Sequence, residues 1–307
     1  MELELWTEVN RAIAAVAADF GRHARDRYCT ADVVRVYHFA CLHDRPMNWA
    51  CNRRNWRGHV PGRPAKLPDQ STMSRRTRRP DFWQFLERLA QHMNHDAGDD
   101  VAGDDAGLTV RVVDGKALEL PNHTTDPDAT WSRGVSRTSV GYKIHAISSG
   151  KPMPDAVAIT TLNVCEKRMA GRLIARAATP GSFGYLLGDG HFDASWLFDR
   201  CAAHDHQLVC PRAKPGTGEG HHYVSTHRRR SIAMLEVPAA VNPFGHDLYA
   251  QRTAIEREFS QLVCFGAGLG HLPSWVRRIW RVRPWVMNKL LINAARIRIR
   301  RRRRNAA

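Results

Sequence analysis

The sequence lacks the features of a membrane protein, a secreted protein and a nucleotide-driven enzyme. It has no run of about 18 apolar residues, so we expect no membrane span. The start, MELELWTEVN, is acidic and has no basic segment followed by an apolar one, so we expect no signal peptide. No GxxxxGKS or GxxxxGKT motif occurs, and we therefore expect no nucleotide cofactor.

Paired cysteines are also missing. The seven cysteines are an odd number, and none of them forms a CxxC pair. We therefore expect neither a zinc site nor a disulfide framework, but reduced thiols in a cytoplasmic protein. The pair His221 and His222 has no matching ligands at a useful spacing, so a metal role there is disfavoured.

The composition indicates a polyanionic partner. Lysine and arginine number 46 against 30 acidic residues, giving a net charge of +16. Such a charge predicts binding to DNA or RNA rather than to a membrane surface. The chain has 307 residues and is 43% hydrophobic, enough for a large core and one or two domains.

The N-terminal third has helical periodicity. We predict helices over 2–20 and 31–43, the second capped by Thr30 and interrupted by Pro46. A short helix follows, capped by Asp69 or Ser71. Pro80 should end it and Asp81 should cap the next helix.

The short helix, STMSRRTRR, is strongly basic. We interpret it as the recognition helix of a helix-turn-helix-like module, whose cationic side chains contact DNA: Arg75, Arg76, Arg78 and Arg79. The alternative is a solvated arginine face on a small helical bundle.

Composition divides the chain further. We predict a helical DNA-binding domain over 1–95, an acidic linker over 96–107 and a catalytic domain over 108–270 with an insert at about 213–248. A helical region with an arginine-rich tail follows over 271–307, with a break or kink at Pro284.

The catalytic segment is predicted to contain strands at 108–115, 140–149, 155–163, 184–192 and 206–212, with helices at 165–178 and 194–204. The first strands suit an antiparallel meander and the later ones parallel crossovers. This order predicts an α/β fold with a ribonuclease H-like mixed sheet, flanking helices and a preceding small all-α domain.

Three acidic residues stand out in this segment. Asp114 and Asp189 are expected at the ends of apolar strands, and Glu256 on a helix after Tyr249 and Arg252. Alone, a strand-end aspartate is ordinarily a turn or cap residue. Together, three carboxylates offer the oxygen ligands that Mg²⁺ prefers, and paired ions can stabilise both the attacking and the leaving oxygen at a phosphate.

Two residues beside Glu256 have two interpretations each. Arg252 lies one helical turn before Glu256, where it can hold a phosphate or form an i,i+4 ion pair with that glutamate. Tyr249 can contact DNA, or its ring can pack in the protein with the hydroxyl group at a polar edge. We favour packing.

These segments resemble the DDE transposases encoded by bacterial insertion sequences. The resemblance rests on the segments VDGKALELPNHTTDPDATWSRG, GYKIHAI, LNVCEK, GYLLGDGHFD and LYAQRTAIEREFSQL. The spacing of Tyr249, Arg252 and Glu256 is similar to part of a signature of that family, which usually adds a lysine seven positions later. Here that position is Val263.

The resemblance implies that Asp114, Asp189 and Glu256 hold two Mg²⁺ ions, with Mn²⁺ as a substitute. It also implies that water first cuts a phosphodiester at the element end, and that the freed 3′-hydroxyl then attacks target DNA. The expected partner is double-stranded DNA, both element ends and target. A homodimer in a synaptic complex, acting at the nucleoid of a bacterial cytoplasm, is also expected.

Two alternatives stay open from sequence. In the first, the chain is a catalytically silent DNA-binding regulator derived from a transposase, which the missing lysine at position 263 allows. In the second, it is a metal-dependent nuclease that cuts DNA without strand transfer.

Overall fold

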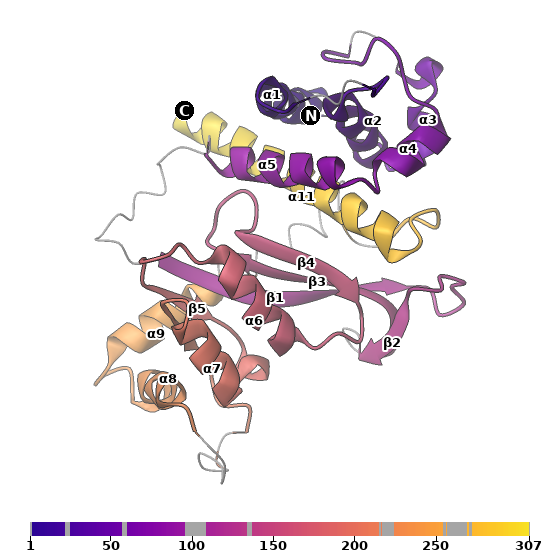
Figure 1. The fold of residues 1–307 in the computed structure, drawn as a ribbon. Coiled ribbons are helices and arrows are strands. Elements are labelled where there is room, and N and C mark those ends of the chain that lie inside the picture. Colours follow the sequence, from indigo (N-terminus) through magenta and orange to yellow (C-terminus); the bar gives the residue numbers. More distant parts are fainter. Residues whose placement is uncertain are drawn as a thin grey trace. The chain divides into compact units, whose positions relative to one another are not determined.

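The computed structural model divides the chain into two compact units (Figure 1). Met1–Asp100 and Leu262–Ala307 form one, here the helical unit, and Val101–Gln261 the other, here the sheet unit. The described residues are 2–21, 25–56, 60–95, 109–133, 137–214, 216, 224–253, 256, 269 and 272–306. The predicted linker at 96–107 lies outside them, as do His221, His222 and Val263.

The sheet unit is built on one mixed sheet. Its strands are β1 (Thr109–Leu120), β2 (Thr130–Arg133), β3 (Thr138–Ser148), β4 (Ala156–Thr161), β5 (Gly184–Leu187) and β6 (His206–Val209). The order is β2-β3-β1-β5-β6, and β4 also pairs with β3. The first pairings are antiparallel, while β1–β5 and β5–β6 are parallel. This confirms the α/β class and the ribonuclease H-like mixed sheet, with β2 as an unpredicted addition.

The first strand is longer than expected. We predicted that it ends at Gly115, but β1 continues to Leu120. It pairs with β3 from Val112, opposite Ser148, to Leu120, opposite Val140. The prediction was wrong because the strand was ended with its continuous apolar run, and the later residues are held by pairing with β3. An antiparallel partner satisfies the backbone groups of such a segment whatever its side chains are.

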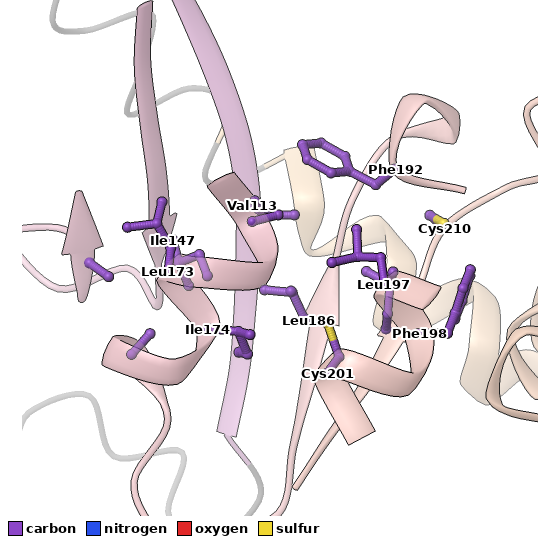
Figure 2. Packing of buried hydrophobic residues seen from close by; sticks show 14 residues of the cluster. Val113, Ile147, Leu173, Ile174, Leu186, Phe192, Leu197, Phe198, Cys201 and Cys210 are labelled. Atoms are coloured by element: carbon purple, nitrogen blue, oxygen red, sulfur yellow. The ribbon is translucent and has the colours of Figure 1, made fainter. Parts of the chain in front are cut away.

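Helices cover both faces of this sheet. Adjacent residues of a strand point to opposite faces, so Val113 packs with α6 (Glu166–Ala177) and α7 (Ser195–Ala202), as Figure 2 shows. Val112 packs on the other face, against residues of α8 (Thr226–Glu236) and α9 (Pro243–Ala250). The predicted insert at 213–248 therefore contains α8 and most of α9, which the sequence analysis did not identify as helices.

The helical unit combines the two ends of the chain. Its helices are α1 (Glu2–Ala18), α2 (Thr30–Leu42), α3 (Met47–Ala50), α4 (Gln70–Arg76), α5 (Pro80–His95) and α11 (Ile279–Asn305), with a short 3₁₀ turn at Arg53–Asn55. The all-helical N-terminal region is as predicted. The sequence analysis treated 271–307 as a separate region, whereas α11 packs against α1, α2 and α5. Within the described ranges, no helix has both the length and the apolar character to cross a membrane.

Helix starts in this unit follow local chemistry. Asp69 caps α4 as predicted, accepting a hydrogen bond from Thr72 N at 2.7 Å. Thr30 does not cap α2, because Cys29 occupies that position and its Sγ accepts from Asp32 N. Asp81 does not cap α5 either. Pro80 is the first residue of α5, where its fixed φ and missing N–H are tolerated.

The predicted break at Pro284 is absent, since α11 runs continuously from Ile279 to Asn305. Buried neighbours on both sides of the proline hold the helix, and Asn288 Nδ2 donates to Pro284 O at 2.9 Å. The arginine-rich end of α11 is helical as well, and Arg298 pairs with Glu8 of α1 at 2.8 Å.

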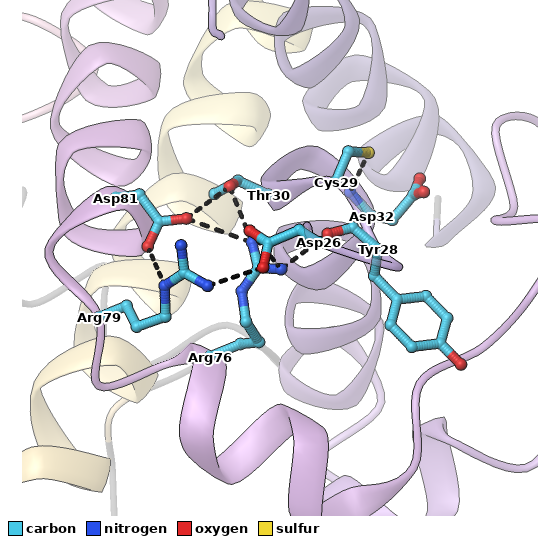
Figure 3. Close-up of polar contacts among 8 residues, drawn as sticks. All are labelled: Asp26, Tyr28, Cys29, Thr30, Asp32, Arg76, Arg79 and Asp81. Carbon is cyan, nitrogen blue, oxygen red and sulfur yellow. Dashed lines mark hydrogen bonds and ion pairs between the residues drawn. The ribbon is translucent and has the colours of Figure 1, made fainter. Parts of the chain in front are cut away.

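Two arginines of the predicted recognition helix are internal ion-pair partners (Figure 3). Arg76 has an 8% exposed side chain and contacts Asp26 at 3.1 Å and Asp81 at 3.2 Å. Arg79 contacts the same two carboxylates, at 2.9 and 3.0 Å. Thr30 Oγ1 donates to Asp81 Oδ2 at 2.8 Å. We therefore correct the assignment of Arg76 and Arg79 from DNA contacts to structural ion pairs.

The other two arginines of this segment are exposed. Arg75 is exposed on α4, and its guanidinium contacts Thr72 Oγ1 at 3.3 Å. Arg78 lies over the Trp280 ring, with 3.9 Å between its Cζ and the ring centroid. These two side chains remain candidates for contact with a polyanion.

Replacing Arg76 by Ala should destabilise the helical unit by about 3 kcal/mol, because it leaves Asp26 and Asp81 short of a buried cationic partner. The melting temperature of the variant, followed by the helical circular dichroism signal, should lie roughly 6 °C or more below that of the parent chain. Arg75→Ala, an exposed neighbour on the same helix, is the matched control and should change stability by less than about 0.5 kcal/mol. Equal melting temperatures for the two variants would show that the Arg76 ion pairs are dispensable.

Candidate active site

The parallel pairing of β1 and β5 brings Asp114 and Asp189 to the same level of the sheet. Val112 of β1 is paired with Leu187 of β5. Asp114 lies two residues beyond Val112, and Asp189 two residues beyond Leu187. A two-residue step returns to the same face of a strand, so Asp114 follows Val112 on the face packed against α8 and α9. Two aspartates far apart in sequence thus become neighbours.

Asp189 is held by the turn that follows β5. Its side chain caps the 3₁₀ turn Gly190–Phe192 and accepts a hydrogen bond from His191 N at 2.9 Å. Phe192 is buried in the core beneath α6 and α7 (Figure 2). The packed phenylalanine therefore anchors the loop that carries the aspartate.

The third acidic residue, Glu256, follows α9 in the chain. Tyr249, on α9, packs against the Val112 face and donates from its hydroxyl to Gly188 O at 3.2 Å. This agrees with the packing interpretation of the tyrosine. Arg252 and Glu256 follow in helical conformation and form an ion pair at 2.5 Å. The i,i+4 pair considered as one interpretation of Arg252 is thus present.

The pKa of Asp114 depends on burial and on the charges of the other two acids. Burial raises the pKa of Asp114 to about 6, against the opposing effect of a hydrogen bond from Gly115 N at 2.7 Å. The negative charges of Asp189 and Glu256 raise the same pKa further. The charges of both acids therefore act on Asp114, and their joint role in one site stays a prediction.

A fourth carboxylate, which the sequence analysis did not single out, lies against Gly115, the residue after Asp114. Glu166, in the first turn of α6, also raises the pKa of Asp114. A Cβ atom on Gly115 would lie only 2.9 Å from Glu166 Cδ, so the glycine makes room for this side chain. Lys143 Nζ donates to Glu166 Oε1 at 2.7 Å. The acid at a helix start in LNVCEK was the available signal, but it resembles an ordinary first-turn glutamate.

Asp193, a nearby acid in the sequence, does not join the group. Its two carboxylate oxygens accept from Arg228 at 2.5 and 2.9 Å, and Oδ2 also accepts from Ala213 N. The aspartate is a structural ion-pair partner between the loop after β5 and α8.

The carboxylates near Asp114 fit a hard cation by chemistry. Their oxygens are the donors that Mg²⁺ and Mn²⁺ take, and mutual repulsion favours a positive charge among them. In the described part of the chain, no three acidic, histidine or cysteine side chains are already gathered closely enough to hold a metal ion. Glu256 is turned to Arg252 instead.

Two comparisons with known proteins gave matches, one to a family and one to a solved structure. Residues 105–271 match the model of a family described as the transposase DDE domain. A cryo-EM structure of a piggyBac transposase synaptic complex with hairpin DNA matches at 12% identity and a TM-score of 0.35, covering 71% of this chain and 50% of that chain. This chain thus spans about half the length of that transposase. Among curated proteins, none matches.

Replacing Asp114 by Asn should stabilise the metal-free protein near neutral pH. The folded pKa of about 6 lies above the ordinary value of about 3.9. The folded state therefore keeps a proton that the unfolded state releases between these values. Stability of the parent falls as pH rises through this window, by about 3 kcal/mol in total. The asparagine variant is free of this loss.

The measurement is thermal denaturation of both proteins in EDTA at pH 4 and pH 7. The advantage of the variant should be present at pH 7 and vanish at pH 4. Asp247→Asn, an exposed aspartate on α9, serves as the control and should show no such trend. A variant that is less stable than the parent at pH 7 would contradict the raised pKa.

Proposed function

The chain belongs to the transposase DDE domain family, and from this premise we propose that it cuts DNA at the ends of an insertion sequence and joins them to target DNA. Asp114, Asp189 and Glu256 are the proposed catalytic carboxylates. The observation that carries the proposal is the β1–β5 register, which supports a shared site for the two aspartates. The influence of Glu256 on the pKa of Asp114 supports the third member.

The proposed cofactor is a divalent cation, as the family generally uses, with Mg²⁺ preferred and Mn²⁺ as substitute. Asp114, Asp189 and Glu256 would hold it, two ions in all, and the ions would polarise phosphate oxygens and neutralise developing charge. The protein itself positions the reacting groups on a rigid sheet, since phosphoryl transfer asks for little covalent chemistry from side chains.

The reaction has two steps in this proposal. A water oxygen forms a bond to the phosphorus at the element end, and the bond to the 3′-oxygen breaks, leaving a free 3′-hydroxyl. That hydroxyl then attacks a phosphodiester of the target and displaces another 3′-oxygen. Each step exchanges one phosphorus–oxygen bond for another, so no nucleotide is consumed.

Double-stranded DNA is the proposed partner. The net charge of +16 supports a polyanion. Arg75 and Arg78, both exposed, are the proposed contacts of the helical unit, and Arg252 a contact near the cut. Two copies of the chain on paired element ends, in the cytoplasm at the nucleoid, complete the proposal.

Changing Asp114, Asp189 or Glu256 to Ala should each reduce cutting and joining below detection, because each carboxylate is a proposed metal ligand. The assay is gel analysis of labelled element-end DNA and a target plasmid with Mg²⁺, and Mn²⁺ should replace it. Ca²⁺ should allow assembly but little chemistry, since it is larger and less demanding in geometry. DNA binding should survive in all three variants.

Asp247→Ala is the matched control, an exposed acid on α9 that should leave activity intact. Asp193→Ala is unsuitable because that aspartate is paired with Arg228. Cutting that persists in the Asp114 or Asp189 variant would refute the site. A parent protein that binds element ends but never cuts is the silent regulator, and one that cuts without joining is a nuclease.

Arg252→Ala should lower the rate of DNA cutting roughly tenfold to a hundredfold, because a reacting phosphate would be held less precisely. The melting temperature should barely change, because an exposed i,i+4 pair contributes only about 0.5 kcal/mol or less. Cleavage rate and thermal stability measured on the same preparation check this. If both fall in parallel, Arg252 is a structural partner of Glu256 and not a DNA contact.

A further inference from the structure

The outer face of α6 and α7 carries an exposed tryptophan among arginines. The inner faces of both helices pack on the sheet through Leu173, Ile174, Leu197 and Phe198 (Figure 2). On the opposite side, Trp196 is 48% exposed. It lines a shallow groove with five other residues, here the Trp196 groove: Arg168, Gly171, Arg172, Asp199 and Arg200.

A glycine sets the position of the tryptophan ring. A Cβ atom on Gly171 would lie 3.1 Å from Trp196 Cζ3, closer than side chains ordinarily approach, and 3.5 Å from Arg200 Cγ, an ordinary contact distance. The missing side chain lets α7 place its tryptophan directly on the backbone of α6. Arg200 Nε fixes this contact by donating to Gly171 O at 3.2 Å.

The charge around the ring is strongly positive. Arg168 and Arg172 are both exposed and lie one turn apart on α6, about 6 Å along its axis. Within the described part of the chain, neither arginine has a salt bridge. The nearby carboxylate of Asp199 accepts a hydrogen bond from Ser225 Oγ. The groove thus combines cationic side chains with an accessible aromatic face.

We infer that the Trp196 groove binds an unpaired strand of DNA. A base stacks on Trp196, while Arg168 and Arg172 contact adjoining phosphates. Aromatic platforms with cationic flanks bind single strands in this way, because every base has a face to stack. A base within a duplex has both faces covered by its neighbours. The inference rests on DNA being the ligand of the proposed function, but not on the three catalytic carboxylates.

The first test is binding of a single-stranded oligonucleotide to the full-length chain in EDTA. Trp196→Ala should weaken binding about tenfold, the effect expected for losing one stacked base, and Trp196→Phe should retain most of the affinity. Trp131→Ala removes another exposed tryptophan of the sheet unit and should have little effect. Equal losses for the Trp196 and Trp131 alanine variants would overturn the inference.

The second test uses salt and photocrosslinking. Replacing Arg168 and Arg172 by Gln should reduce the slope of log affinity against log salt by about 1.4, from two lost phosphate contacts. The same change at Arg229 and Arg230 of α8 is the control and should leave the slope nearly unchanged. An oligonucleotide containing 5-iodouracil should crosslink to the peptide that holds Trp196. Crosslinks confined to other peptides would overturn the assignment.

Three further outcomes separate the possible failures. If the Trp196 variants change the oligomeric state by light scattering but keep their affinity for DNA, the groove is a protein interface and the inference is wrong. If the groove binds the strand as described but the parent chain does not cut DNA with Mg²⁺, only the proposed function fails. If the chain binds and cuts DNA while all groove variants bind normally, only this inference fails.

Discussion

The parallel pairing of β1 with β5 is the constraint on which the candidate site depends. It sets Asp114 and Asp189 at matching positions of neighbouring strands, although the chain between them forms three other strands and a helix. A shift of one residue in this register would send one carboxylate to the opposite face. The buried residues on the two faces of the sheet oppose such a shift, so the core around Val112 and Val113 also fixes the site.

Positive charge serves two different purposes in this chain. In the helical unit, Arg76 and Arg79 bind the buried Asp81 and the half-buried Asp26, and hold α4 to the start of α2 and α5. On the outer face of α6 and α7, arginines surround an exposed tryptophan. A net charge counted from sequence includes both kinds, and only burial and partners separate them. The available cationic surface is therefore smaller than the count of arginines suggests.

The sequence predicted most elements of the sheet unit because their apolar runs have a strand or helix period. The full length of β1 could not be predicted, since its second half is stabilised by β3 rather than by its own side chains. The buried position of Arg76 depends on its ion pairs with Asp26, which is distant in sequence, and with Asp81 of the next helix. The local rules for helix capping predicted Asp69 correctly. They could not predict that α11 continues through Pro284, because tertiary packing stabilises the helix there.

The helical unit is assembled from both ends of the chain, which has a consequence during synthesis. Helices α1 to α5 leave the ribosome first, but the buried face they share with α11 stays uncovered until residues 279–305 have emerged. Domains ordinarily fold as their segments are completed. The whole sheet unit is translated in that interval, so it can fold before the last helix of the helical unit has been synthesised. A ribosome-bound chain truncated before α11 would expose apolar surface that chaperones recognise.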